Sequence, residues 1–251
     1  MPHVDPAERR EALRSVHKPP WSKRSLATAG ALLAVSAAAV ALAPPLRSGD
    51  PAAGADAASI VREPSYQDPA LLARALALPV AAAYVAAGLE YQRNASFCGP
   101  TTAVDVARSL GTPADPAHAL DGTGVRTWFG YVWGGLTLEG EAALLRARTG
   151  RRVTVLRDLD LAAFRAELAH ANDPARRYAV NFARAPLFGR GGGHHSPVGG
   201  YLADRDLVLV LDVNRNYRPW LVSTERLFEA VDTVDRATGK RRGLLRVDES
   251  P

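Results

Sequence analysis

The chain has 251 residues, a formal net charge of +5 and 47% hydrophobic residues, which is the composition of an ordinary globular protein. Its basic residues are scattered arginines, with no Lys/Arg block interleaved with aromatic residues, so no nucleic-acid partner is expected. Its single cysteine, Cys98, excludes an internal disulfide and a cysteine-rich metal site.

The N-terminal part differs in composition from the rest of the chain. Residues 1–25 are polar and basic and predict a cytoplasmic n-region, and residues 26–43 are 18 uncharged residues that would span about 27 Å as a helix. Residues 44–64 predict a flexible linker. We expect an uncleaved signal anchor, because Pro44 disfavours cleavage, with a cleaved signal peptide as the alternative. The domain 65–251 is therefore expected to be anchored to the membrane and extracytoplasmic, or secreted to the periplasm.

Hydrophobic periodicity and turn residues predict the elements of this domain. Helices are expected over residues 71–78, 98–110, 138–149, 161–171 and 224–231. Residues 112–135 are expected to form a loop-rich insert. Strands are expected over residues 152–156, 178–182, 195–202, 207–213 and 243–247, and the turn 203–206 joins two of them in a hairpin. Along the chain the predicted helices come first and the strands of an antiparallel sheet follow, and this order predicts the α+β class.

Cys98 opens one of the predicted helices. A sulfur at that position faces unpaired N–H groups and the positive end of the helix dipole, and both favour the thiolate. A nucleophilic thiolate needs a base, and the base needs a group that orients it. Gln92, on the loop before Cys98, could supply an oxyanion donor.

The predicted hairpin offers both a base and an orienting group. His194 and His195 lie at the start of its first strand, and Asp212 lies near the end of its second, so all three reach the same edge of the sheet. A regular hairpin would place Asp212 opposite Pro197, three residues from His194. Either a β-bulge, at Gly199-Gly200, or strong twist is expected to close this gap.

Five motifs in this order resemble the phytochelatin synthase family, the glutathione γ-glutamylcysteinyltransferases. They are Gln92-x5-Cys98-Gly99, Val180-Asn181-Phe182-x-Arg184, Gly193-His194-x-Ser196-Pro197-x-x-x-Tyr201, Leu211-Asp212-Val213-x-Arg215 and the run from Thr233 to Gly243. The resemblance covers about Ser65 to Val247. It implies a papain-like cysteine-protease fold.

The resemblance also implies roles for individual residues. Cys98 would be the nucleophile, His194 its acid–base partner, Asp212 the group that orients the imidazole, and Gln92 the oxyanion donor. His194 is preferred over His195 because the histidine of the family lies two residues before the Ser-Pro pair. The residues expected to bind substrate are Asn181, Arg184, Gly193 and Arg242. Arginine suits glutathione, which carries two carboxylates.

As implied by the resemblance, the substrate is glutathione, and its Cys–Gly bond is cleaved through a γ-Glu-Cys acyl-enzyme. Water would then release γ-Glu-Cys, and a second glutathione would instead give phytochelatin. The chain resembles the short bacterial members, which mainly remove glycine. No cofactor is required, and heavy-metal ions would enter as glutathione thiolates. The N-terminal segment would contact the membrane, and a homodimer is one option for the oligomeric state.

Two alternatives stay open. The first is a papain-like peptidase that acts on other peptides outside the membrane. The second is a non-catalytic metal-binding module that uses Cys98, His194 and His195, since one cysteine and two histidines can hold zinc with one open position. Release of glycine from glutathione would separate these alternatives from the first hypothesis.

Overall fold

The computed structural model describes residues 59–248. The predicted n-region, the predicted anchor and most of the predicted linker lie outside these residues. The described chain begins with a 3-10 helix, η1 (Ile60–Arg62), and Ile60 is fully buried in the hydrophobic core. The folded domain therefore begins before Ser65, within the stretch 44–64 that was predicted to be a linker.

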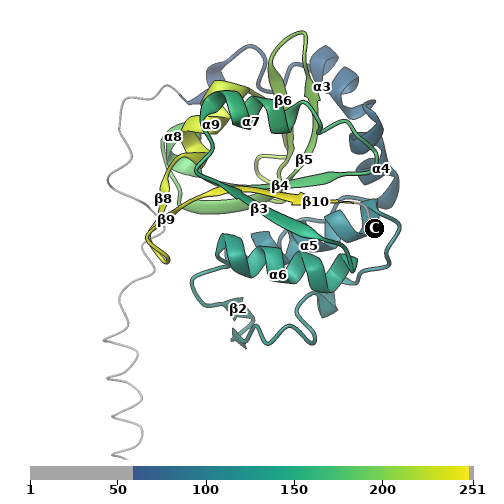
Figure 1. Cartoon of the computed structure of the whole chain (residues 1–251), viewed down its shortest axis with the longest axis vertical. Coiled ribbons are helices and arrows are strands. Elements are labelled where there is room, and N and C mark those ends of the chain that lie inside the picture. The colour runs from purple at the N-terminus through teal and green to yellow at the C-terminus, as the bar shows by residue number, and fades with distance from the viewer. Residues whose placement is uncertain (1–58, 249–251) are drawn as a thin grey trace, which may run out of the picture. The chain divides into compact units, whose positions relative to one another are not determined.

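A six-stranded antiparallel sheet is the centre of the domain (Figure 1). Its strands, in spatial order, are β3 (Val153–Arg157), β10 (Gly243–Val247), β4 (Arg177–Ala183), β5 (Gly193–Leu202), β6 (Leu207–Leu211) and β7 (Pro219–Ser223). Side chains alternate between the two faces of a strand. In β6, Val208 and Val210 enter one hydrophobic core and Leu209 enters the other, so both faces of the sheet are buried.

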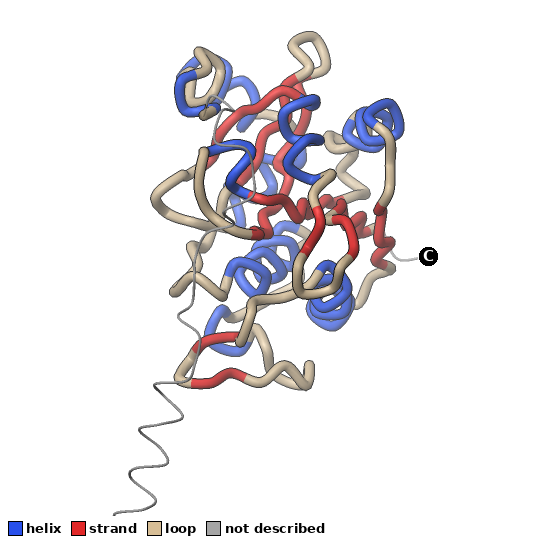
Figure 2. The backbone as a smooth tube through the Cα atoms, turned by 90° about the vertical axis from the view of Figure 1, so that its left-hand side faces the viewer, coloured by secondary structure: helices blue, strands red, loops and turns tan. Residues whose placement is uncertain are grey.

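Helices cover both faces of this sheet (Figures 1 and 2). One core is completed by α3 (Pro69–Leu76), α4 (Pro79–Ala87), α5 (Cys98–Ser109) and α6 (Leu138–Thr149). The other is completed by η1, α7 (Leu161–Leu168), α8 (Arg184–Phe188) and α9 (Thr224–Val231). This architecture confirms the predicted α+β class.

Local sequence signals determine where several helices begin and end. α6 begins after Thr137, whose hydroxyl accepts a hydrogen bond from the backbone N–H of Gly140 at 3.1 Å, and it ends at Gly150, which has a φ of +67°. α9 begins after Ser223, whose hydroxyl accepts from the N–H of Arg226 at 3.3 Å. The predicted bounds of both helices are confirmed.

Other elements differ from the prediction. α3 ends at Leu76, and Pro79 begins a second helix, α4, because proline fits the first turn of a helix. α7 ends at Leu168, earlier than predicted. β6 stops at Leu211, so Asp212 follows the strand and does not belong to it. The helix α8 and the strand β7 were not predicted.

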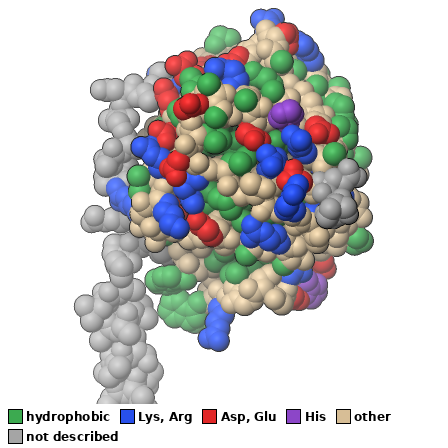
Figure 3. All heavy atoms as spheres, viewed as in Figure 1, with side chains coloured by type: hydrophobic (Ala, Val, Ile, Leu, Met, Phe, Trp, Pro, Cys, Tyr) green, Lys and Arg blue, Asp and Glu red, His purple; other side chains and the backbone are tan. Residues whose placement is uncertain are grey.

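Two short hairpins lie outside the sheet. The first is β1 (Thr127–Trp128) with β2 (Tyr131–Val132), and the second is β8 (Val234–Asp235) with β9 (Lys240–Arg241). The first belongs to the predicted loop-rich insert, which also contains the 3-10 helix η2 (Pro116–His118). The ring of Trp128 contacts those of Phe129 and Trp133, and all three side chains are more than half exposed. Figure 3 shows apolar side chains at the lower end of this face, where β2 lies in Figure 1.

Among residues 59–248, no single helix is long and apolar enough to cross a bilayer. α3 and α4 reach the required length only as a pair, with a bend of 86° between them.

Candidate active site

The hairpin of β5 and β6 brings His194 and Asp212 together. Its register shifts by one residue between Val198 and Gly200, so of the two alternatives, a bulge or strong twist, the bulge is present. Nε2 of His194 lies 3.0 Å from Oδ1 of Asp212. A Cβ on Gly199 would lie 2.8 Å from Cδ2 of Leu209, so only glycine fits at this bulge.

Asp212 is buried and has a donor for each lone-pair direction. Both of its oxygens accept from Nη2 of Arg184, at 2.8 and 2.9 Å. Oδ2 also accepts from Nε1 of Trp220 at 2.9 Å, and Oδ1 accepts from the N–H of Asn214 at 2.8 Å. Burial opposes the charge of this carboxylate, but His194, Arg184 and Trp220 outweigh burial and hold the pKa of Asp212 well below its usual range.

His194 is a neutral imidazole in this environment. Burial lowers its pKa, the positive charge of Arg184 lowers it further, and the opposing effect of Asp212 does not restore it. Because Nε2 faces a carboxylate, Nε2 carries the proton and Nδ1 is the basic nitrogen. Among the described residues, Nδ1 of His194 has no hydrogen-bond partner.

Cys98 is the first residue of α5 and is buried, with 5% of its surface exposed. The backbone N–H groups of His195 and Gly99 stabilise the thiolate, which places the sulfur beside the start of β5, where His194 lies. Burial nevertheless raises the pKa of Cys98 to about 11, and the nearby carboxyl of Glu141 adds to the rise. The backbone donor at the helix terminus lowers the pKa, as expected, but burial outweighs it, so the neutral thiol is favoured.

No hydrogen bond joins the sulfur of Cys98 to the imidazole of His194 in the described chain. The resting site therefore holds a neutral thiol and a neutral imidazole. Any proton transfer between them has to accompany the approach of a substrate.

The loop before Cys98 is held by hydrogen bonds to the rest of the site. The N–H of Gln92 donates to the carbonyl of Val213 at 2.8 Å, next to Asp212. Nε2 of Gln92 donates to the carbonyl of Asn94 at 3.0 Å, and Oε1 is buried without a partner. One amide N–H of Gln92 is therefore committed to its own loop, and the second is left for a ligand.

The predicted substrate-binding residues divide into two groups. Arg184 is buried against Asp212, and its Nη1 has no partner. Nδ2 of Asn181 lies 2.9 Å from Nε2 of His195, and Oδ1 of Asn181 is buried without a partner. Arg184 therefore contacts Asp212, and Asn181 contacts His195, the neighbour of His194 on β5.

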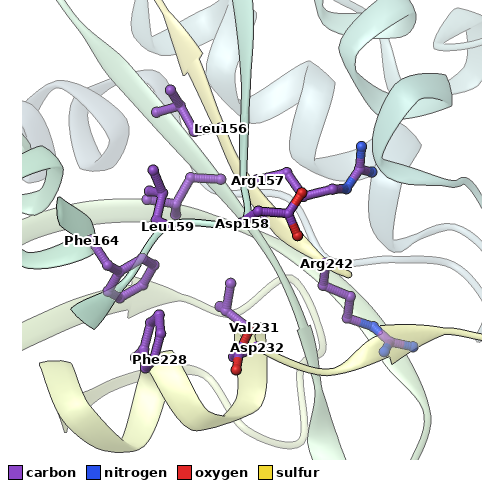
Figure 4. Close-up of a pocket in the computed structure, with 11 residues that line it drawn as sticks. Leu156, Arg157, Asp158, Leu159, Phe164, Phe228, Val231, Asp232 and Arg242 are labelled. Carbon is purple, nitrogen blue, oxygen red and sulfur yellow. The ribbon is translucent and has the colours of Figure 1, made fainter. Parts of the chain in front are cut away.

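Gly193 and Arg242 form the second group. A Cβ on Gly193 would lie 3.0 Å from Nη2 of Arg242, so glycine leaves room for the guanidinium. Nη1 of Arg242 donates to Oγ1 of Thr233 and to the carbonyl of Val234, at 3.0 and 2.8 Å. In Figure 4 this side chain lines a pocket between β3 and α9, and its guanidinium points away from the ring of Phe228.

His195 faces the opposite side of the sheet from His194. Its Nε2 lies 3.0 Å from the carbonyl oxygen of Leu136 and 2.9 Å from Nδ2 of Asn181, and its Nδ1 is buried without a partner. Burial lowers the pKa of His195 to about 4. The structure therefore brings His194, and not His195, to Asp212.

Two residues of the site were missed by the sequence analysis. Trp220 donates to Asp212, and nothing in its local sequence indicates this contact. Glu141 is fully buried beside Cys98. Its position could have been found, because it lies in the apolar stripe of α6 together with Leu138, Ala142 and Leu145.

Among residues 59–248, no three His, Cys, Asp or Glu side chains are grouped so that they could hold a metal ion. The zinc hypothesis for Cys98, His194 and His195 therefore has no support in the arrangement of these side chains.

Comparison with known proteins places the chain in a family. Residues 57–244 match the model of the phytochelatin synthase family. Glutathione gamma-glutamylcysteinyltransferase 1 of Arabidopsis thaliana is 54% identical over 56 residues, which are 22% of this chain and 12% of that protein. The Schizosaccharomyces pombe enzyme of the same name is 27% identical over 169 residues, which are 61% of this chain and 40% of that protein. The chain thus spans less than half the length of these relatives.

The same comparison with solved structures gives a weaker likeness. A C39-like peptidase from Bacillus anthracis aligns with a TM-score of 0.46 and 12% identity, over 66% of this chain and 96% of that chain. This score is too low to support an argument. The family model, which covers most of the chain, shows that the protein belongs to the phytochelatin synthase family.

Proposed function

We propose that this protein is a glutathione γ-glutamylcysteinyltransferase that cleaves the Cys–Gly bond of glutathione with Cys98 as nucleophile. The observation that carries the proposal is the 3.0 Å contact between His194 and Asp212 at the strand end beside the only cysteine, within a chain of this family. The curated relatives carry the same activity in their names.

The first half-reaction forms a thioester. Sγ of Cys98 attacks the carbonyl carbon of the cysteine residue in glutathione, and its proton passes to Nδ1 of His194. The amide bond then breaks, and His194 gives that proton to the leaving amine of glycine. The products are free glycine and γ-Glu-Cys bound to Cys98 as a thioester.

The second half-reaction regenerates the thiol. His194 takes a proton from the attacking water or amine, the thioester bond breaks, and the sulfur recovers a proton. Water gives γ-Glu-Cys, and the amine of a second glutathione gives phytochelatin. Which acceptor dominates depends on whether the occupied site excludes water.

The electrostatics support general-base activation in place of a preformed ion pair. Both partners start neutral, since burial raises the pKa of Cys98 and lowers that of His194. Asp212 stays ionised and stabilises the imidazolium that forms during attack. Backbone N–H groups at the start of α5 and the free amide N–H of Gln92 would stabilise the oxyanion.

Unpartnered polar atoms support a polar, charged substrate. Oδ1 of Asn181, Nη1 of Arg184 and Oε1 of Gln92 are buried and make no hydrogen bond. A buried polar group without a hydrogen-bond partner costs free energy, so binding of a ligand that supplies the missing partners is favoured. Glutathione offers an ammonium group, two carboxylates and two amides for these atoms.

We also propose the finer properties that the sequence suggested. The fold is papain-like, the N-terminal segment 26–43 anchors the protein to the membrane, and the catalytic domain is extracytoplasmic. Heavy-metal ions enter as glutathione thiolates, and no cofactor takes part. A peptidase acting on other peptides is the alternative that the same triad could serve.

Free glycine is the product that tests this function. The full chain is incubated with glutathione, and glycine, γ-Glu-Cys and phytochelatin are measured together. We expect glycine from the wild type and none from Cys98→Ala, while Ser96→Ala, on the same loop, keeps its activity within a few-fold. Glycine release that persists in Cys98→Ala would contradict the proposal. Absence of release from the wild type, with cleavage of other peptides, would favour the peptidase.

A further inference from the structure

Glu141 is the buried group beside the nucleophile that the proposed mechanism does not use. It lies on the first turns of α6, and none of its surface is exposed. Neither of its two carboxyl oxygens has a hydrogen-bond partner. An unpartnered buried carboxylate is very costly, so this group is protonated in the resting protein.

The backbone at the start of α5 is shaped around this carboxyl group. A Cβ on Gly99 would lie only 2.3 Å from Oε2 of Glu141, so any other residue at this position would displace the carboxyl group. Gly99 follows Cys98 directly, so the carboxyl sits against the same turn that carries the sulfur. Glycine at this position therefore makes room for the acid.

We propose that Glu141 is a positioning residue for the nucleophile: protonated beside Cys98 it permits the thiolate, and once ionised it holds Cys98 as the neutral thiol. Two negative charges cannot share one buried site at close range, because each raises the cost of the other. Ionisation of Glu141 at alkaline pH therefore disfavours the thiolate of Cys98 and so limits the reactivity of the sulfur. The proposal rests on the nucleophile role of Cys98.

The electrostatics of the two groups agree with this geometry. Burial raises the pKa of Glu141 well above its ordinary value. The negative charge of Glu141 in turn raises the pKa of Cys98. No opposite charge within the described chain offsets Glu141 directly, since neither of its oxygens forms a salt bridge there.

Several other titratable groups belong to the site, and they differ in charge and in their effect on Glu141 and Cys98. From β5, His194 and His195 are neutral, since burial lowers the pKa of both. Arg184, at the start of α8, favours the thiolate of Cys98. Asp212 is ionised, and its charge is offset by Arg184.

Other charged groups lie on the elements packed against α6. On α5, Oδ1 of Asp105 accepts from the N–H of Glu90, its Oδ2 is buried without a partner, and burial raises its pKa to about 7. Arg108 pairs with the side chain of Glu90. On β3, Arg157 pairs with Glu139, an acid of α6 that is partly exposed. Glu141 is therefore the acid whose charge the thiol senses.

The test is the pH dependence of alkylation of Cys98 by iodoacetamide in the full chain, because the rate reports the thiolate and needs no glutathione. Glu141→Gln keeps the shape of the side chain and removes the charge. We expect its midpoint to lie about one pH unit below that of the wild type, which is a roughly tenfold gain in thiolate at a pH below both midpoints at which Glu141 of the wild type is ionised. At a lower pH, where Glu141 is protonated, the two rates should converge. Glu139→Gln, on the same helix, should leave the profile unchanged.

A second variant guards against a folding defect. Glu141→Leu also removes the charge and replaces the buried acid by an apolar side chain of similar volume, a change that proteins often tolerate. It should give the same fall in midpoint. A midpoint in the folded variants equal to or above that of the wild type would overturn the proposal. Because glutathione is absent, this outcome would leave the proposed function standing.

Discussion

Two buried carboxyl groups belong to the candidate site, and they behave in opposite ways. Asp212 is surrounded by donors from Arg184, Trp220 and the backbone, in addition to His194, and its pKa is held well below the usual range. Glu141 has no donor for either oxygen, and its pKa lies well above the usual range. Burial is nearly complete for both. Partners, and not burial, therefore decide which carboxyl is ionised.

The contrast assigns different roles to the two acids. An ionised Asp212 can stabilise an imidazolium on His194 during attack. A protonated Glu141 leaves the sulfur of Cys98 free to accept negative charge. The site thus contains one carboxylate and one carboxylic acid at the same pH, as sites for acid–base chemistry often do.

Of the changes predicted to disturb the two acids, removal of the charge of Asp212 should have the largest effect, and the affected quantity is the rate of glycine release. Asp212→Asn leaves His194 without a carboxylate and Arg184 buried without its ion pair, so glycine release should fall about 10²–10⁴-fold. Steady-state kinetics with glutathione measure the loss in kcat. Asp204→Asn is the matched control, because Asp204 lies in the turn of the same hairpin and pairs with Arg74 at the surface. Equal activity of Asp212→Asn and wild type would contradict the orienting role.

Acid should destabilise the protein through its buried histidines. His195 has a pKa of about 4 in the folded protein, against about 6.5 when unfolded, so the unfolded chain binds more protons between these values. The contribution of His195 to the free energy of unfolding should therefore fall by about 3 kcal/mol as the pH drops from about 6.5 to 4, and His194 acts in the same direction. Asp105 and Glu141 act in the opposite direction in this window, because burial raises the pKa of both carboxyls.

Urea unfolding at several pH values measures this loss. His195→Gln should remove about 3 kcal/mol of the loss of stability toward acid in this window, relative to the wild type, since the side chain no longer titrates. Asp212 does not interfere, because its depressed pKa places its own loss of stability at lower pH. A curve equally steep in His195→Gln and wild type would refute the assignment to His195.

Weakening one donor to Asp212 should have the smallest effect. Trp220→Phe keeps the ring packed against Phe182 and Phe188 and removes the hydrogen bond to Oδ2. A hydrogen bond to a charged group is worth about 1.5–3 kcal/mol, so the free energy of unfolding should fall by that amount. Thermal or urea unfolding checks it, with Trp128→Phe as a control on the exposed hairpin. A loss no larger than that of the control would mean that Arg184 alone suffices.

Much of the fold could be predicted because its signals are local. The caps at Thr137 and Ser223 and the glycine at 150 fix α6 and α9 to the residue. The helix α8 was missed because it is short and follows β4 without a capping side chain. A five-residue helix held by tertiary contacts of Arg184 leaves no periodic pattern.

The candidate site likewise has features that could be predicted from local sequence and features that depend on tertiary contacts. Hairpin geometry predicted that His194, His195 and Asp212 reach the same edge of the sheet, with a bulge as one of two ways to close the register gap. The choice of His194 over His195 came from the family resemblance. The ionisation of Cys98 could not be predicted, because the helix terminus is a local feature and burial is a tertiary one. Glu141 left a signal, an acid in the apolar stripe of α6, whose meaning depends on the sulfur packed against it.

The central claim is that Cys98 carries the acyl group, and intact-mass and peptide mass spectrometry of the acid-quenched protein test it most directly. After brief incubation with glutathione, the account predicts a γ-Glu-Cys adduct on the peptide that contains Cys98, with release of an equal amount of glycine. Glycine release without any adduct on that peptide, or an adduct on another residue, would contradict it.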